Sequence, residues 1–220
     1  MLTRREFLPH VAPFAAAWLA GSFSGCRNVQ HAKVLADNDA DTVGSHSAGA
    51  ETWKPLVRES VGRLLYRQTS SIQLTGHEVP HARKRICFVG IENKSAEDLG
   101  DFKEQIYQHI DTLINESEAF EPINRRYVDA GLQQCGLRAD QLFIANNQRM
   151  FAASMEKFEQ PFDYLLYATI TSGTTKSNKN YQRDYLLTLE LIDIYSGQTE
   201  KESAEIRKGY RRGPLGLLRS

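Results

Sequence analysis

Residues 84–92 constrain the fold most. They form a short apolar run with charged residues only at its ends, Lys-Arg-Ile-Cys-Phe-Val-Gly-Ile-Glu. A run of this length is typical of a β-strand. Because polar and apolar residues do not alternate within it, it indicates a strand that is covered on both faces. The sequence therefore predicts a β-sheet with helices packed on each side.

The rest of the chain alternates between helical and extended patterns. Apolar spacing predicts helices over residues 52–68, 99–113, 125–135 and 139–158. Further strands are predicted over residues 120–124, 162–172, 181–195 and 201–211, with loops over 69–83 and 173–180. Ser95 and Asp98 are expected to cap the second helix, and Gly136 to end the third. The order predicts an α/β fold, a mixed β-sheet flanked by helices, as a single domain over residues 52–211.

The first residues predict export. Two adjacent arginines, Arg4 and Arg5, precede Phe-Leu and a weakly apolar run over residues 11–23. This order is that of a cleavable signal and resembles the twin-arginine consensus. Ser-Gly stands directly before Cys26, as small residues do in a lipobox. We expect residues 1–25 to be a twin-arginine lipoprotein signal peptide and Cys26 to carry the lipid. The alternative is an ordinary signal peptide followed by a coincidental cysteine.

Two segments lack any apolar period. Residues 26–51 are rich in His, Ala, Asp, Ser and Gly and predict a lipidated cysteine followed by a flexible linker. A coil of this length spans roughly 25–30 Å on average, which is a modest reach. Residues 212–220 contain Gly-Pro and predict a disordered tail.

Charge and cysteine content exclude some functions. Without Arg4, Arg5 and Glu6, the 27 basic and 27 acidic residues become 25 and 26. A nearly neutral chain gives no indication of a nucleic-acid partner. Cys87 and Cys135 remain besides Cys26. An exported pair can form a disulfide, but no spacing rule links them, so two separate buried thiols are favoured.

No catalytic motif stands out. His77 and His81 would form a metal-binding face on a helix, but Gly76 and Pro80 indicate a loop and no third ligand is evident. We therefore expect no metal and no cofactor. A P-loop, a nucleophile elbow and a dinucleotide fingerprint are absent.

Paired acids are the remaining catalytic candidates. They are Glu97, Asp98 and Asp101, and then Glu116 and Glu118. A glycan hydrolase needs two carboxylates across a cleft. Both sets fall at expected helix ends, and helix-dipole and solvation roles account for the first set. The sequence therefore favours a protein that is not an enzyme.

Several segments resemble the LpoB-type activators of penicillin-binding proteins. They are Phe-Val-Gly-Ile-Glu-Asn-Lys-Ser at 88–95, Leu-Ile-Asn-Glu-Ser-Glu-Ala-Phe at 113–120, Gly-Leu-Arg-Ala-Asp-Gln at 136–141, Phe-Asp-Tyr-Leu-Leu-Tyr-Ala at 162–168, and the meander over 187–197. The similarity covers roughly residues 53–210. It implies a TolB N-terminal/CsgG-like domain, carried by an outer-membrane lipoprotein that faces the periplasm and docks on a class A penicillin-binding protein. The twin-arginine signal and the short linker depart from that family.

The expected function is regulation of a peptidoglycan synthase by protein–protein contact. The lipid is expected to anchor the protein to the membrane. Alternatives are a CsgG-like assembly or secretion accessory lipoprotein and an envelope hydrolase. Tyr and Arg are enriched at interface hot spots. The candidate contacts are therefore polar and aromatic residues of predicted exposed loops. For each of them the alternative is an ordinary surface residue that binds no partner. They are Glu92, Asn93, Arg125, Arg126, Tyr127, Lys176, Lys179 and Tyr181.

Overall fold

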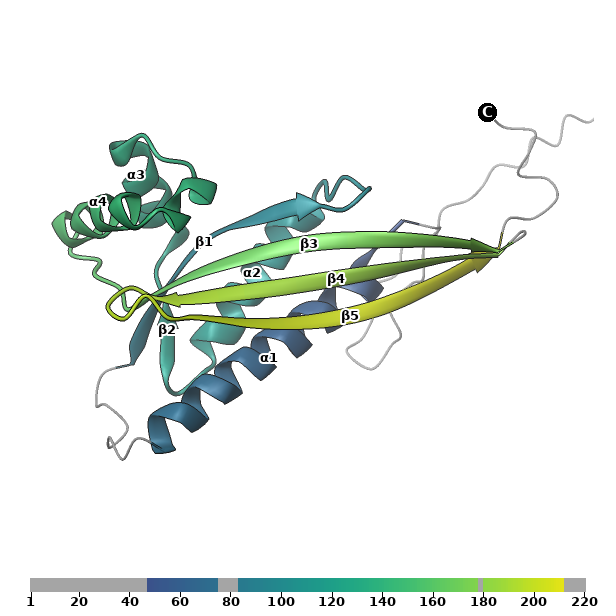
Figure 1. Cartoon of the computed structure of the whole chain (residues 1–220), viewed down its shortest axis with the longest axis horizontal. Coiled ribbons are helices and arrows are strands. Elements are labelled where there is room, and N and C mark those ends of the chain that lie inside the picture. Colours follow the sequence, from purple (N-terminus) through teal and green to yellow (C-terminus); the bar gives the residue numbers. More distant parts are fainter. Residues whose placement is uncertain (1–46, 75–82, 178–179, 212–220) are drawn as a thin grey trace, which may run out of the picture. The chain divides into compact units, whose positions relative to one another are not determined.

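Five strands form one mixed sheet in the order β2-β1-β3-β4-β5 (Figure 1). The computed structural model describes residues 47–74, 83–177 and 180–211, all within one unit. The elements are α1 (Ala50–Leu74), β1 (Lys84–Lys94), α2 (Phe102–Asn115), β2 (Phe120–Pro122), α3 (Arg125–Cys135), the 3₁₀ helix η1 (Ala139–Phe143), α4 (Ala145–Lys157), β3 (Tyr164–Ser177), β4 (Asn180–Asp193) and β5 (Thr199–Arg211). The predicted order of helices and strands and the α/β fold class are confirmed.

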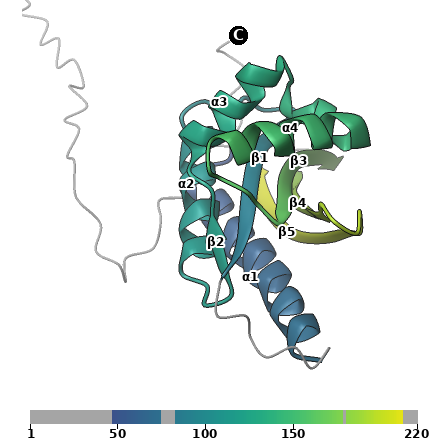
Figure 2. The ribbon, with the colours of Figure 1, turned by 90° about the vertical axis from the view of Figure 1, so that its left-hand side faces the viewer.

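Helices cover both faces of the sheet near β1. Figure 2 shows α1 and α2 on one face and α3 and α4 on the other. β1 runs parallel to β2 and β3, whereas β3, β4 and β5 are antiparallel. Ile86 and Phe88 are fully buried in the core on the α1 side, while Cys87 and Val89 are buried in the core on the α3 side. The prediction of a strand covered on both faces is confirmed.

Helix α1 is longer than predicted at both ends. Ala50 and Glu51 were predicted to belong to the linker, but they belong to the helix. The Gly49 carbonyl accepts a hydrogen bond from the Thr52 amide at 2.9 Å, and Ala48 packs on the core. The helix also continues through the predicted connector to Leu74. There the hydroxyls of Ser/Thr residues donate to carbonyls four residues earlier, which lets such residues stay helical.

The predicted loop over residues 173–180 is wrong. β3 continues to Ser177 and β4 begins at Asn180, so almost the whole segment is paired. Its threonines prefer extended backbone, and pairing with β4 provides hydrogen bonds that a sequence pattern cannot reveal. No helix of the described part is long and apolar enough to cross a bilayer.

Two helix predictions also need correction. The predicted helix over 139–158 is interrupted at Ile144, whose extended backbone separates η1 from α4. Ser95 and Asp98 do not cap α2, which begins at Phe102 after Asp101. Gly136 does end α3, with a φ of 64° in the left-handed region, as predicted.

Candidate functional site

A hollow of about 450 Å³ opens beside the free edge of β1, and we call it the β1 groove. β2 pairs with β1 only from Lys84 to Ile86, so among the described strands none pairs with this edge further along. The starts of α2, α3 and η1 border this unpaired stretch instead. The groove is lined by Val89, Gly90, Ile91, Gly100, Asp101, Lys103, Glu104, Tyr107, Arg125, Ala139 and Tyr167.

Arg125 and Tyr107 form one wall of the β1 groove. The Tyr107 ring stacks on Phe88 with centroids 4.2 Å apart, and its hydroxyl donates to the Phe88 carbonyl. The Arg125 guanidinium lies 4.3 Å from the centre of the same ring, and its Nε is 2.8 Å from Asp129 Oδ1. Burial raises the pKa of Tyr107. Arg125 therefore presents a permanent cation held in place over an aromatic ring.

Tyr167 and Glu92 form the other polar pair near the β1 groove. The Tyr167 hydroxyl donates to Glu92 Oε2 at 3.4 Å, and Lys94 Nζ lies 2.9 Å from the same oxygen. Burial, followed by the Glu92 charge, raises the pKa of Tyr167 to about 12. Tyr167 also meets the half-exposed ring of Phe143 edge-on at 5.0 Å. Aromatic rings thus lie beside the charged groups on both walls of the groove.

The predicted contact residues fall into separate places. Arg125 lines the β1 groove, and Glu92 touches its Tyr167 wall. Asn93 instead holds its own loop, since its side chain donates to the Glu97 carbonyl at 2.7 Å and accepts from Ser95. Arg126 and Tyr127 are exposed on α3.

Lys176 and Tyr181 lie at the far end of the sheet. They are direct partners across β3 and β4, and Tyr210 of β5 is the next partner in the same row. We call these three residues the tyrosine row. Lys179, Cys26, His77 and His81 lie outside the described residues.

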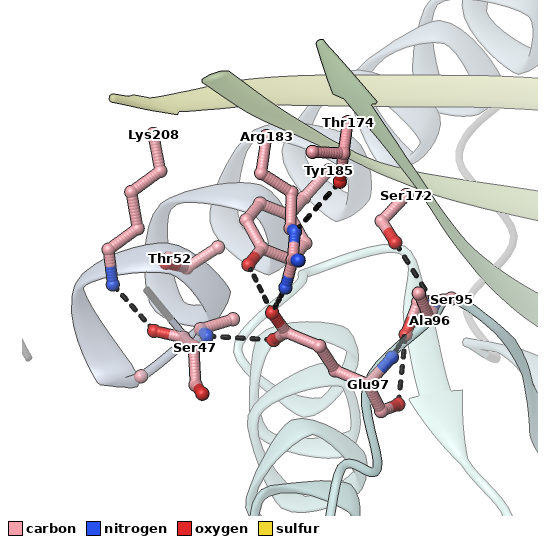
Figure 3. Close-up of polar contacts among 12 residues, drawn as sticks. Ser47, Thr52, Ser95, Ala96, Glu97, Ser172, Thr174, Arg183, Tyr185 and Lys208 are labelled. Carbon is pink, nitrogen blue, oxygen red and sulfur yellow. Dashed lines mark hydrogen bonds and ion pairs between the residues drawn. The ribbon is translucent and has the colours of Figure 1, made fainter. Parts of the chain in front are cut away.

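The sequence interpretation missed a buried polar cluster around Glu97, which we call the Glu97 clamp (Figure 3). Glu97 pairs with Arg183, and its Oε1 accepts from the Tyr185 hydroxyl at 3.0 Å. Its Oε2 accepts from the backbone amide of Ala48 at 2.9 Å. The Glu97 and Arg183 side chains are only 13% and 14% exposed. The solvation role predicted for Glu97 is therefore wrong.

A second ion pair completes the clamp. Lys208 Nζ of β5 lies 2.8 Å from Glu51 Oε1, and it also donates to the Ser47 carbonyl. Burial would raise the pKa of Glu51, but the hydrogen bond and charge of Lys208, together with hydrogen bonds from the backbone amides of Glu51 and Gly49, lower the pKa overall. The two pairs tie the start of α1 to β4 and β5. The one sequence signal was that Glu97 belonged to a set of acids with Asp98 and Asp101.

The structure brings few reactive groups together. Asp101 and Glu104 line the β1 groove, but both belong to the start of α2 and so stand on one wall. Among the described residues no three His, Cys, Asp or Glu side chains gather as metal ligands would. Cys87 and Cys135 are both free thiols, and Cys87 is buried as predicted, whereas Cys135 is only partly buried. A second hollow of about 460 Å³, between α4 and the β4–β5 turn, is bordered by alanines and by Arg149 and Glu156.

Comparison with known proteins found similar solved structures. No protein-family model matches the chain, and no curated protein matches it. The chain is similar to the LpoB C-terminal domain from Salmonella enterica, with 12% identity, a TM-score of 0.45, and 73% of this chain and 98% of that chain covered. The LpoB C-terminal domain from Escherichia coli gives 15% identity, a TM-score of 0.44, and coverage of 69% and 97%.

A third similar structure is lipoprotein GNA1162 from Neisseria meningitidis, with 21% identity, a TM-score of 0.42, and coverage of 61% and 90%. The mixed sheet with helices on both faces is observed in the chain itself. Similarity of this degree assigns no partner or activity to this chain.

Proposed function

We propose that this chain is an envelope lipoprotein, exported through residues 1–25 and anchored through Cys26, which binds and regulates a peptidoglycan synthase. The sequence resemblance to LpoB-type activators suggests a class A penicillin-binding protein as the partner and the outer membrane as the site of the anchor. The β1 groove is the observation that carries binding as the function. It combines an open strand edge, aromatic rings on both walls and a fixed cation.

These features suit a protein partner. Arg and Tyr concentrate binding energy at interfaces because they join large buried area to directed hydrogen bonds. An open strand edge can receive an extended segment of another chain. A volume of about 450 Å³ admits a few side chains of that segment. We infer that a partner inserts an extended stretch along β1, with an acidic or carbonyl group facing Arg125.

The groove suits glycan hydrolysis poorly. The two carboxylates of a glycosidase flank the bond that they cleave from opposite sides. Asp101 and Glu104 both lie at the start of α2, Asp101 at its N-cap and Glu104 in its first turn, so they share one wall of the groove. Binding without catalysis therefore accounts better for this arrangement, although glycan cleavage by the purified chain would revive the hydrolase alternative.

A pull-down with the lipidated chain tests the binding function. We expect it to retain a class A penicillin-binding protein from solubilised envelopes. Lys103→Glu together with Arg125→Gln should weaken that binding at least tenfold, because both cations line the groove. Lys157→Glu is the matched control, since Lys157 is an exposed lysine at the end of α4. Equal binding by all three proteins would refute the assignment of the groove.

Two further measurements test the remaining parts of the proposal. Cys26→Ser should abolish acylation and move the chain out of the membrane fraction; unchanged partitioning would contradict the lipid anchor. Sizing of the detergent-solubilised chain separates the regulator from a CsgG-like assembly protein. A ring-sized particle would favour assembly.

A further inference from the structure

We propose that the tyrosine row, at the far end of β3, β4 and β5, docks onto the anionic lipid surface of the membrane that carries the anchor. The inference rests on the lipid anchor proposed above and assigns these residues to lipid, whereas the sequence had placed Lys176 and Tyr181 among the partner contacts. Figure 1 shows the three strands continuing past the N-terminal end of α1.

The tyrosine row is an ordered surface feature. Strand register places Lys176, Tyr181 and Tyr210 directly opposite one another on three adjacent strands. The two tyrosine rings stack at 5.0 Å with their planes 9° apart, and Lys176 Nζ lies 5.5 Å from the centre of the Tyr181 ring. Alternation along β4 puts Tyr181 on the same face as Tyr185, beyond the part that α1 covers. Tyrosine joins an apolar ring to a polar tip, as side chains at the membrane–water boundary do.

Basic residues outnumber acidic ones at this end of the sheet. The paired strand ends, residues 174–177, 180–183 and 207–211, contain five lysines and arginines and no acidic residue. Two of these cations are neutralised within the Glu97 clamp. Lys176 and Arg207 are exposed. Arg207 stands directly opposite Asp184 of β4, and neither cation forms an ion pair among the described residues. Cations near a membrane surface are attracted to anionic lipid headgroups.

The attachment point of the tether brings this end close to the membrane. The clamp holds Ser47 and Ala48 against Lys208 and Glu97, so the chain from Cys26 joins the domain beside the basic strand ends. About 20 residues separate Cys26 from Ser47, and a flexible coil of that length averages about 25 Å. The anchor therefore concentrates this end of the domain at the lipid surface, where a few weak contacts suffice to orient it. Lipid is therefore favoured over an acidic protein as the binding partner, because a protein would have to fit between this end of the domain and the membrane.

Quenching by brominated lipid tests the docking. The lipidated full chain with Tyr210→Trp is reconstituted into vesicles of phosphatidylcholine containing about one-third phosphatidylglycerol. Tyr195→Trp is the matched control, because Tyr195 is a 76% exposed tyrosine after the opposite end of β4. Trp53 is buried and is common to both proteins. We expect bromolipid quenching at position 210 to exceed that at position 195 at least threefold.

A second pair of variants tests the charge. Lys176→Glu with Arg207→Glu should reduce the excess quenching at position 210 by at least half, whereas Arg58→Glu with Lys157→Glu, an equal charge change at exposed sites elsewhere, should leave it. Unchanged thermal unfolding midpoints check that the variants are folded.

Equal quenching at positions 210 and 195 in vesicle-bound protein would overturn the docking and leave the anchor standing. Failure of the chain to float with vesicles would overturn both the anchor and the docking. If the Lys176→Glu/Arg207→Glu variant loses a protein partner while quenching at the two positions is equal, the row binds protein and the proposal is wrong.

Discussion

Glu97→Ala should destabilise the domain by about 2–4 kcal/mol. The carboxylate accepts from three groups that come from distant parts of the chain: Arg183, the Tyr185 hydroxyl and the Ala48 amide. Removal of the acid leaves a guanidinium that is only 14% exposed without its counter-charge. It also leaves a hydroxyl and an amide without this acceptor.

The magnitude follows from partial burial. Breaking a fully buried ion pair by deleting one member costs about 3–5 kcal/mol, and an orphaned buried hydrogen-bonding group costs about 1–3 kcal/mol. The side chains of Glu97 and Arg183 keep some contact with water, at 13% and 14% exposure, which lowers the estimate. Glu59→Ala is the comparison, because Glu59 forms an exposed ion pair with Arg63 within α1. This substitution should cost less than about 0.5 kcal/mol.

Urea unfolding and hydrogen exchange test the clamp together. Urea titration of Glu97→Ala, Arg183→Ala and the double variant gives the coupling energy, which should exceed about 1 kcal/mol. Exchange of the Ala48 amide should accelerate at least tenfold in Glu97→Ala and stay unchanged in Glu59→Ala. A loss of stability below about 1 kcal/mol, or an Ala48 amide that exchanges as in the parent chain, would refute the reasoning.

Three further predictions concern other parts of the molecule. Gly131→Ala should destabilise the domain by about 1–3 kcal/mol in thermal unfolding, because the added Cβ would lie 2.9 Å from the Phe151 ring. An unchanged unfolding midpoint would contradict the close packing of α3 on α4. A thiol reagent at pH 8 should label Cys135 and spare Cys87, whose pKa is raised by burial, until denaturant is added; equal rates in the native chain would contradict this burial. Because the pKa of Glu51 is lowered on folding, its contribution is present above its unfolded value of 4.5 and is lost as the pH falls, so Glu51→Gln should flatten the acid side of the stability profile.

Local patterns revealed those parts of the fold that depend on local chemistry. The run over residues 84–92 identified a doubly covered strand because its apolar residues face two cores at once. Gly136 identified a helix end because few other residues adopt its positive φ. The predicted loop over 173–180 was wrong because Thr and Lys carry no alternation there, and only pairing with β4 makes the segment extended.

The Glu97 clamp could not be found by such reasoning. The partners of Glu97 stand 49 and 88 residues away, so no window along the chain contains the cluster. Near an expected helix start, an acid is ordinarily explained by the helix dipole. The β1 groove was partly anticipated, since Arg125 was a candidate. Tyr107 and Tyr167 were missed because the patterns around them predicted only a helix and a strand, and did not show which side chains line a groove.

The tether and the two proposed surfaces constrain one another. A linker of about 20 residues gives little reach, so a domain anchored at Cys26 meets a partner only near its own membrane. Docking of the tyrosine row would add a second point of attachment and limit rotation about the tether. The β1 groove is built from β1, α2 and α3, whereas the row is built from the far ends of β3, β4 and β5, so lipid contact does not use the residues that would bind the partner. A synthase bound at the groove would then be held at a fixed orientation to the lipid surface, which a flexible tether alone cannot provide.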